Sequence, residues 1–174
     1  MNKLTKNERL DELLLKATIH DYDPFWDSSQ KEKEVLKNIQ VLLDNGANPN
    51  NLIYWDKYMD NEETLLSYVV IKIFWNDKNF SFYSQVAELF IQAGADITDI
   101  TESKFTALDY LILNGGIEGI NQNTYRLAKL MITSLSSEKL KFYLQHNRKE
   151  STFIGLQNIL KVFDKYDSYI EYMF

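Results

Sequence analysis

The strongest constraint in this chain is a short segment that occurs twice, each time at the end of a run of apolar residues. Residues 41–50 read VLLDNGANPN, and residues 89–98 read LFIQAGADIT. Glycine, alanine and an amide or acid occupy the same three positions in both copies. Glycine in this position supplies the left-handed conformation that ends many helices. A repeat at this spacing indicates stacked units that cannot bury their apolar faces alone.

A second pair of segments repeats out of phase with the first. Residues 64–72 (TLLSYVVIK) and 106–114 (TALDYLILN) both open with threonine, a favourable helix N-cap. Apolar residues follow at the i, i+3, i+4 spacing of a helix with one apolar stripe. The β-branched run 68–71 suggests a strand when taken alone, but its match to 110–113, where leucine enters, favours a helix.

The composition is that of a mostly helical globular chain. Hydrophobic residues make up 45% and charged residues 25% of the 174 residues, which argues against a disordered tail. Only 6 glycines and 2 prolines are present, so many short strands joined by tight turns are not expected. The absence of cysteine excludes disulfides, thiol nucleophiles and thiolate metal ligands. We therefore expect an all-α fold in a single domain, 1–174.

Charge and hydropathy exclude several classes of partner. The net charge of −6 and the pI of about 5.0 repel phosphate backbones, and no basic stripe offsets them, so nucleic-acid binding is not expected. No signal peptide is evident, and no uncharged run approaches the roughly 18 residues of a membrane span. We expect a cytoplasmic protein that does not bind membranes and is a monomer by itself.

The repeated unit resembles the ankyrin repeat, whose consensus opens with Thr-Pro-Leu-His and closes with Leu-Leu-x-x-Gly-Ala-Asp over about 33 residues. The interval from Gly94 to Thr106 equals the family's own spacing. The matching residues are Thr64 and Thr106, Leu66 and Leu108, Gly46-Ala47-Asn48 and Gly94-Ala95-Asp96.

The chain also departs from this consensus. About nine extra residues, 74–83 (FWNDKNFSFY), separate the helices of the middle repeat, and about six extend the first finger within 51–63. Whether the 74–83 insertion binds or only packs is left open, although Phe74 and Phe82 are expected to pack. The consensus proline is replaced by Leu65 and Ala107, and the histidine by Ser67 and Asp109.

The resemblance implies an ankyrin-like solenoid of helix-turn-helix repeats with long finger and inter-helix insertions. The glycine cluster at 114–121 (NGGIEGIN) lacks the Gly-Lys-Ser/Thr of a phosphate-binding loop and is interpreted as the loop within the third repeat. Helices are expected near 7–20, 31–45, 64–75, 84–93, 106–114 and 124–135. The expected parts are a degenerate N-terminal repeat (1–50), a repeat with insertions (51–98), a third repeat (99–136) and a C-terminal helical cap (137–174).

No motif indicates catalysis or a metal site. His20 and His146 lie far apart without metal-ligand spacing, and no G-x-S-x-G elbow occurs. The acidic run 56–63 (DKYMDNEE) lacks the alternating ligands and the glycine of a calcium loop, so it is interpreted as a solvated acidic finger. We expect no cofactor, no metal and no enzymatic activity. A carboxylate site at Asp109 is the remote enzymatic alternative.

The resemblance implies a binding surface on the fingers and the first helices. Carried over residue by residue, the family's variable contact positions are Asp60, Asn61, Glu63, Ile71 and Lys72 in the middle repeat and Glu102, Ser103, Phe105, Leu113 and Asn114 in the third. The first finger adds Asp56 and the aromatic residues Tyr54, Trp55 and Tyr58, whose composition is typical of binding hot spots. Packing of these aromatic residues over helix ends is the alternative. Acids outnumber lysines in both fingers, so we expect a basic partner.

These observations predict a non-enzymatic module that binds another protein. Its most specific form is an immunity or inhibitor protein that neutralises a bacterial toxin. The reasons are a small chain rich in Asn, Lys, Ile and Tyr, as in AT-rich bacterial genomes, and an acidity suited to masking a basic enzyme. The alternative is a bacterial effector or scaffold that binds a host or cellular regulatory protein through the same surface.

Overall fold

The computed structural model describes residues 4–19, 29–56, 59–75, 80–99, 105–117 and 122–146. Over these residues the chain is mostly helical, with seven helices and one two-stranded sheet, as expected for the all-α class. The chain divides into two compact units, Met1–Asp96 and Ile97–Phe174. One domain over 1–174 stays a prediction.

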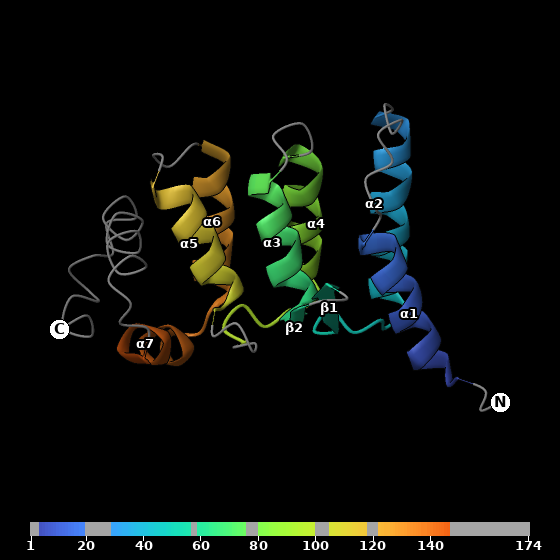
Figure 1. Ribbon diagram of the computed structural model, residues 1–174, viewed down its shortest axis with the longest axis horizontal. Helices are drawn as coiled ribbons and strands as arrows, with labels where there is room; N and C mark the ends of the chain where they lie inside the picture. The colour runs from blue at the N-terminus through green and yellow to red at the C-terminus, as the bar shows by residue number, and fades with distance from the viewer. Residues whose placement is uncertain are drawn as a thin grey trace. The chain divides into compact units, whose positions relative to one another are not determined.

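The first unit contains two helix pairs joined by a β-hairpin (Figure 1). Helix α4 packs against α2, helix α3 packs against α1, and both strands contact α3. The two pairs therefore lie side by side, with the hairpin beside the helix that follows it. The elements are α1 (Lys6–Thr18), α2 (Ser29–Asp44), β1 (Leu52–Asp56), β2 (Met59–Thr64), α3 (Leu65–Trp75) and α4 (Phe80–Gln92).

Helices α2 and α4 end in the same hydrogen-bonded turn, as the repeated segment predicts. Gly46 and Gly94 have φ angles of +94° and +90°. After α2, the N–H of Gly46 donates to the Leu43 carbonyl (2.9 Å) and the N–H of Ala47 to the Leu42 carbonyl (3.0 Å), which are the two bonds of a Schellman motif. The equivalent bonds after α4 run from Gly94 to Ile91 (3.1 Å) and from Ala95 to Phe90 (2.9 Å).

The turns after α2 and α4 are also bonded to neighbouring elements of the first unit. The N–H of Asp96 donates to the side-chain oxygen of Asn50 (2.6 Å), and the N–H of Asn48 donates to the Asp11 carboxylate on α1 (2.7 Å). A side chain of one turn thus satisfies a backbone donor of the next turn. This bond helps to hold the two helix pairs of the first unit together.

Threonine caps the helix that follows the hairpin and the first helix of the second unit. The hydroxyl oxygen of Thr64 accepts from the N–H of Ser67 (3.0 Å) at the start of α3. The hydroxyl oxygen of Thr106 accepts from the N–H of Asp109 (3.1 Å) at the start of α5. The predicted N-caps at Thr64 and Thr106 are confirmed, because each satisfies a backbone donor that the helix leaves open.

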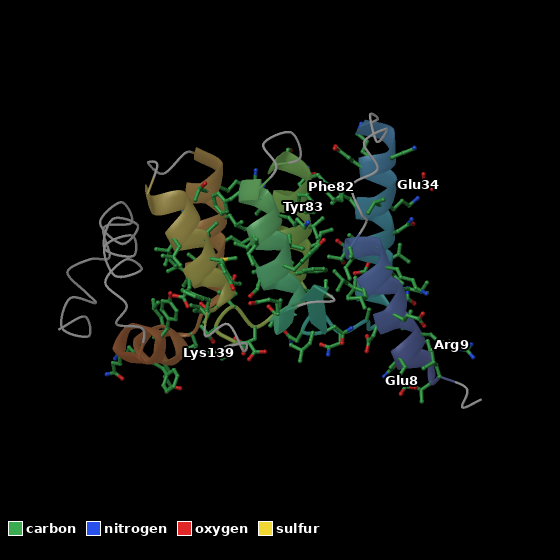
Figure 2. The ribbon with its side chains drawn as sticks, viewed as in Figure 1. Glu8, Arg9, Glu34, Phe82, Tyr83 and Lys139 are labelled. Carbon is green, nitrogen blue, oxygen red and sulfur yellow. The ribbon has the colours of Figure 1, made fainter. Side chains whose placement is uncertain are left out.

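Helix α1 begins with a capping box. The carboxylate of Glu8 accepts from the N–H of Thr5 (2.6 Å), and the Thr5 hydroxyl oxygen accepts from the N–H of Glu8 (3.3 Å). Hydrogen bonds from the Thr5 backbone and then its side chain lower the pKa of the Glu8 carboxyl below its ordinary value of 4.5. Figure 2 shows Glu8 at the first turn of α1.

The second unit contains α5 (Ala107–Ile117), α6 (Gln122–Ser134) and α7 (Ser137–His146). Helix α5 packs against α6, and α7 lies at the end of this pair where α5 begins and α6 ends (Figure 1). Helix α6 has no glycine stop; the hydroxyls of Thr133 and Ser134 donate to the carbonyls four residues earlier (2.8 and 2.7 Å). Ser136 then caps α7 by accepting from the N–H of Lys139 (3.2 Å).

A buried carboxylate joins α5 to α7. Asp109 is 1% exposed, and its Oδ2 accepts from the N–H and the hydroxyl of Thr106 (2.8 and 2.9 Å). Its Oδ1 accepts from the hydroxyl of Tyr143 on α7 (2.6 Å). Leu140, one turn before Tyr143, is also buried, whereas Phe142 is 57% exposed. Helix α7 therefore packs on the second unit through one face.

The predicted apolar stripes form the core, but two expected loops are partly helical. Helix α4 begins at Phe80 rather than near 84, because Phe82 and Tyr83 are buried with their ring centroids 5.2 Å apart (Figure 2). Packing of Phe82 is thereby confirmed. Helix α5 continues to Ile117, so a loop over 114–121 is wrong for 114–117. A glycine within a helix costs only about 1 kcal/mol relative to alanine, which is too weak a preference to end a helix by itself. The buried stripe residues are Leu66, Val69, Val70, Ile73, Leu108, Leu111 and Ile112.

We predict that Gly94→Ala lowers the free energy of unfolding by about 1–2 kcal/mol, the usual cost of left-handed backbone for a residue with a Cβ. A Cβ at Gly94 meets no atom within 4 Å, so the loss reflects the backbone and not a steric clash. Urea unfolding measures the change, and Gln92→Ala at the exposed end of α4 is the control. A Gly94→Ala variant as stable as the parent would contradict this account of the stop.

We predict that Tyr143→Phe lowers the free energy of unfolding by about 1.5–3 kcal/mol, because the buried Asp109 carboxylate loses a donor. Amide exchange should locate the loss in α7 and the start of α5. Phe142→Leu, on the exposed side of α7, should change stability by less than about 0.5 kcal/mol. Equal effects of the two substitutions would show that the hydrogen bond does not hold α7.

We predict that the first turn of α1 loses protection as the pH falls. The pKa of Glu8 is lower in the folded state than in the unfolded state. The Glu8 carboxylate therefore stabilises the first turn fully above the unfolded-state pKa, and this stabilisation is lost as the pH falls through the folded-state pKa, below 4.5. Amide exchange of α1 between pH 6 and about pH 3 measures this loss. Glu8→Gln should flatten the profile, whereas Glu34→Gln on α2 (Figure 2) should leave it unchanged. An unchanged profile in Glu8→Gln would rule out the Glu8 carboxylate as the cause of the pH dependence.

Candidate partner-binding surface

The hairpin β1–β2 carries most of the predicted contact residues. At its base, the N–H of Leu65 donates to the carbonyl of Asn51 (3.0 Å), so the hairpin closes where α3 begins. The register shifts between Tyr54 and Asp56. The finger expected within 51–63 is therefore a hairpin with an irregular ladder. Its cross-strand pairs are Leu52 with Thr64, Ile53 with Glu63, Tyr54 with Glu62 and Asp56 with Met59.

One face of the hairpin base is buried. Ile53 and Glu63 are opposite each other in the ladder, and each is 4% exposed. Both strands contact α3, so this face packs inward. The prediction of a solvated acidic finger over 56–63 is therefore wrong at Glu63, because its strand position directs it inward beside Ile53. Partner contact by Glu63 stays a prediction, and any substitution there also changes a buried site.

The backbone, but not the side chains, is described for six predicted contacts. Three further predicted contacts, Tyr58, Glu102 and Ser103, lie outside the described residues. For all of these positions, partner contact stays a prediction. The six are Tyr54, Trp55, Asp56, Asp60, Asn61 and Asn114, of which Asn114 lies in α5 and the others in the hairpin.

Helix α3 contributes Ile71 and Lys72. Ile71 is 8% exposed, whereas Lys72 is half-buried with its ammonium 5.2 Å from the centroid of the Tyr68 ring. This geometry is a cation–π contact between residues one turn apart, which the i, i+4 spacing makes possible. The lysine is therefore positioned by an aromatic ring that the sequence analysis did not include in the site.

The second unit contributes Phe105 and Leu113, both half-buried. The Phe105 ring lies 5.4 Å from the ring of Tyr110, at a tilt of 39°. Phe105 directly precedes the Thr106 cap, so its contact with Tyr110 lies at the first turns of α5. Packing over a helix end therefore accounts for part of the Phe105 surface.

In the first unit, the predicted contact residues lie on the hairpin and on the α3 helix that follows it. The hairpin closes at Leu65, and Lys72 lies seven positions later, which at the rise of an α-helix is roughly 10 Å along the axis. A single peptide or helix of a partner spans that distance. Leu52, at the hairpin base, is 46% exposed and was not predicted as a contact. Its place before the aromatic run of β1 is the signal that would have included it.

The buried hydrogen bonds of Asp109 explain its presence without catalysis. Thr106 and Tyr143 donate to both carboxylate oxygens, which are closed to solvent. Within the described ranges, no group of three or more His, Cys, Asp or Glu residues is arranged to hold a metal ion. His146, the only histidine described, is the last residue of α7.

None of the helices in the part of the chain that the structure describes has both the length and the apolar character to cross a membrane.

Comparisons with protein-family models, curated proteins and solved structures find no match. The ankyrin resemblance therefore rests on the residues and turns of this chain alone.

Proposed function

We propose that this chain is a non-enzymatic protein-binding module of the ankyrin type, in which hairpin β1–β2 and the half-buried Lys72 on α3 hold a partner protein. The observation that carries the proposal is the repeated Schellman stop at Gly46 and Gly94, each closing the second helix of a pair. Thr64 and Ser67 add a capped helix start directly after the hairpin. These features belong to the repeat consensus at both ends of the unit.

Side-by-side packing in the first unit also supports a repeat architecture. Helix α2 lies against α4, and the Asn50 side chain accepts from the N–H of Asp96 across the two turns. Repeat proteins gain stability through such contacts between equivalent elements of neighbouring repeats. The solenoid proposed here extends this arrangement along the chain.

A protein partner is supported by the chemistry of the hairpin. Residues 52–62 combine Leu, Ile, two tyrosines, a tryptophan and several acids in a short segment. Tyrosine and tryptophan bury a large area at low entropic cost and dominate binding hot spots. The net charge of −6 favours a basic partner by electrostatic steering.

The most specific form of the proposal is inhibition of a basic bacterial toxin, such as a nuclease. An acidic surface would mask the cationic substrate groove of such an enzyme by charge complementarity. Affinity capture from the native host, followed by mass spectrometry, tests this form. A basic toxin supports it, and a host or cellular regulatory protein would instead identify an effector or scaffold.

We predict that Trp55→Ala weakens binding to the captured partner about tenfold or more, as expected for a hot-spot aromatic residue. Isothermal titration calorimetry measures the change, with thermal unfolding as the test of fold. Phe142→Ala is the matched control, because it removes an aromatic side chain that is 57% exposed on α7, an element of the second unit that carries no predicted contact residue. Normal affinity in Trp55→Ala, or an equal loss in Phe142→Ala, would remove the hairpin from the binding site.

A salt series on the same complex tests the role of charge. Raising the ionic strength from about 0.05 to 0.5 M should slow association, because exposed charges are screened beyond the Debye length. An association rate that does not depend on salt would contradict a basic partner. It would not bear on the aromatic contact, which Trp55→Ala tests separately.

A further inference from the structure

The first of the two helix stops contains a chemically labile pair. Asn45 is followed by Gly46, and glycine has no Cβ to hinder attack by its backbone nitrogen on the preceding side-chain amide. Attack on its side-chain amide is one reason why asparagine is counted among the thermolabile residues. The second stop has Ala93 before Gly94 and lacks the reactive amide. The same turn therefore occurs in one chain with and without the labile group.

In the folded chain, hydrogen bonds to α2 hold both reacting groups. The N–H of Gly46 donates to the Leu43 carbonyl (2.9 Å), and the Asn45 side-chain nitrogen donates to the Val41 carbonyl (2.7 Å). Both Asn45 and Gly46 are exposed, and the space beside the Gly46 Cα is open. Water reaches the pair, but the attacking nitrogen is engaged as long as the Schellman turn is closed.

We propose that Asn45 is a deamidation site whose rate is controlled by opening of the α2 stop. When the turn opens, a base removes the Gly46 amide proton, and the nitrogen attacks Cγ of Asn45. A C–N bond forms, and the side-chain nitrogen leaves as ammonia. Water then opens the resulting five-membered succinimide at either carbonyl, which gives aspartate or isoaspartate. The balance is amide plus water to acid plus ammonia, without oxidant or reductant.

Deamidation removes two stabilising features of the α2 terminus. A carboxylate at position 45 has no hydrogen to donate to the Val41 carbonyl, and it adds negative charge beside Asp44 at the negative end of the helix dipole. Isoaspartate also lengthens the main chain by one atom, which disrupts the spacing of the two Schellman bonds.

The effect extends to the junction of the two helix pairs. Asn48 and Asn50, which follow the stop, bond to Asp11 on α1 and to the N–H of Asp96 after α4. A displaced turn at position 45 therefore weakens the bonds that connect α2 to both neighbours. We infer that deamidation lowers the stability of the first unit progressively as the protein ages.

The test uses the full-length protein incubated at mildly alkaline pH, with and without urea, and followed by peptide mass spectrometry. Deamidation at Asn45 should be about tenfold or more slower in the folded protein, because reaction requires local opening. The denatured chain supplies the intrinsic rate at the same residue. Equal rates in folded and denatured protein would overturn control by the stop, and an unreactive Asn45 in urea would overturn the site itself.

Two substitutions exchange the residue that precedes the glycine between the two stops, and each serves as a matched control for the other. Asn45→Ala makes the first stop resemble the second and should abolish modification of this segment. Ala93→Asn makes the second stop resemble the first and should create a new site that is also slower in the folded protein. A fast-reacting asparagine at 93 in the folded state would contradict protection by the Schellman turn.

The product is tested with Asn45→Asp, which adds the charge without lengthening the chain. Its melting temperature should be lower than that of Asn45→Ala, which loses the same donor without adding charge. Added salt should narrow the difference, because the charge is exposed. Equal stability of the two variants at low salt would show that the charge beside Asp44 has no effect.

Discussion

The left-handed glycine after α2 and α4 is the constraint on which the first unit depends. A helix leaves its last carbonyls without partners, and the chain must turn back to satisfy them. At Gly46 and Gly94 the positive φ lets the N–H groups of the glycine and of the alanine after it donate to these carbonyls. The same turn brings Asn50 beside Asp96, so that ending one helix also positions it against its neighbour.

An N-cap and buried side chains stabilise α3 as a helix, although its local sequence propensity favours a strand. The run 68–71 is rich in β-branched residues and would suit a strand. The bond from Ser67 to Thr64 starts a helix immediately after β2, and Val69, Val70 and Ile73 are almost entirely buried in it. Tertiary packing therefore offsets an unfavourable propensity, as is common for helices in folded proteins.

The features that the sequence analysis predicted correctly are local. Thr64, Thr106, Gly46 and Gly94 act on residues within one or two turns, so their spacing in the chain is sufficient evidence. Helix extents were less predictable. Helix α4 begins early at Phe80, where the buried side chains of Phe82 and Tyr83 outweigh local signals, and α5 continues through two glycines, whose helix preference is only weakly unfavourable. The burial of Glu63 depends on strand register. The bond between Asp109 and Tyr143 joins distant residues, and no local pattern marks such a pair.

The chain leaves the second helix of a pair in two different ways, after α6 and after α2. Helix α6 ends in hydroxyl bonds and leads directly into α7, which the buried Asp109 holds through Tyr143. After α2, by contrast, a hairpin closes between Asn51 and Leu65, with Ile53 and Glu63 buried at its base. The bonds described at the start of α3, between Asn51 and Leu65 and between Thr64 and Ser67, involve residues outside 54–62. Substitutions within that segment do not remove the residues that form these bonds, which suits the recognition surface that we propose there.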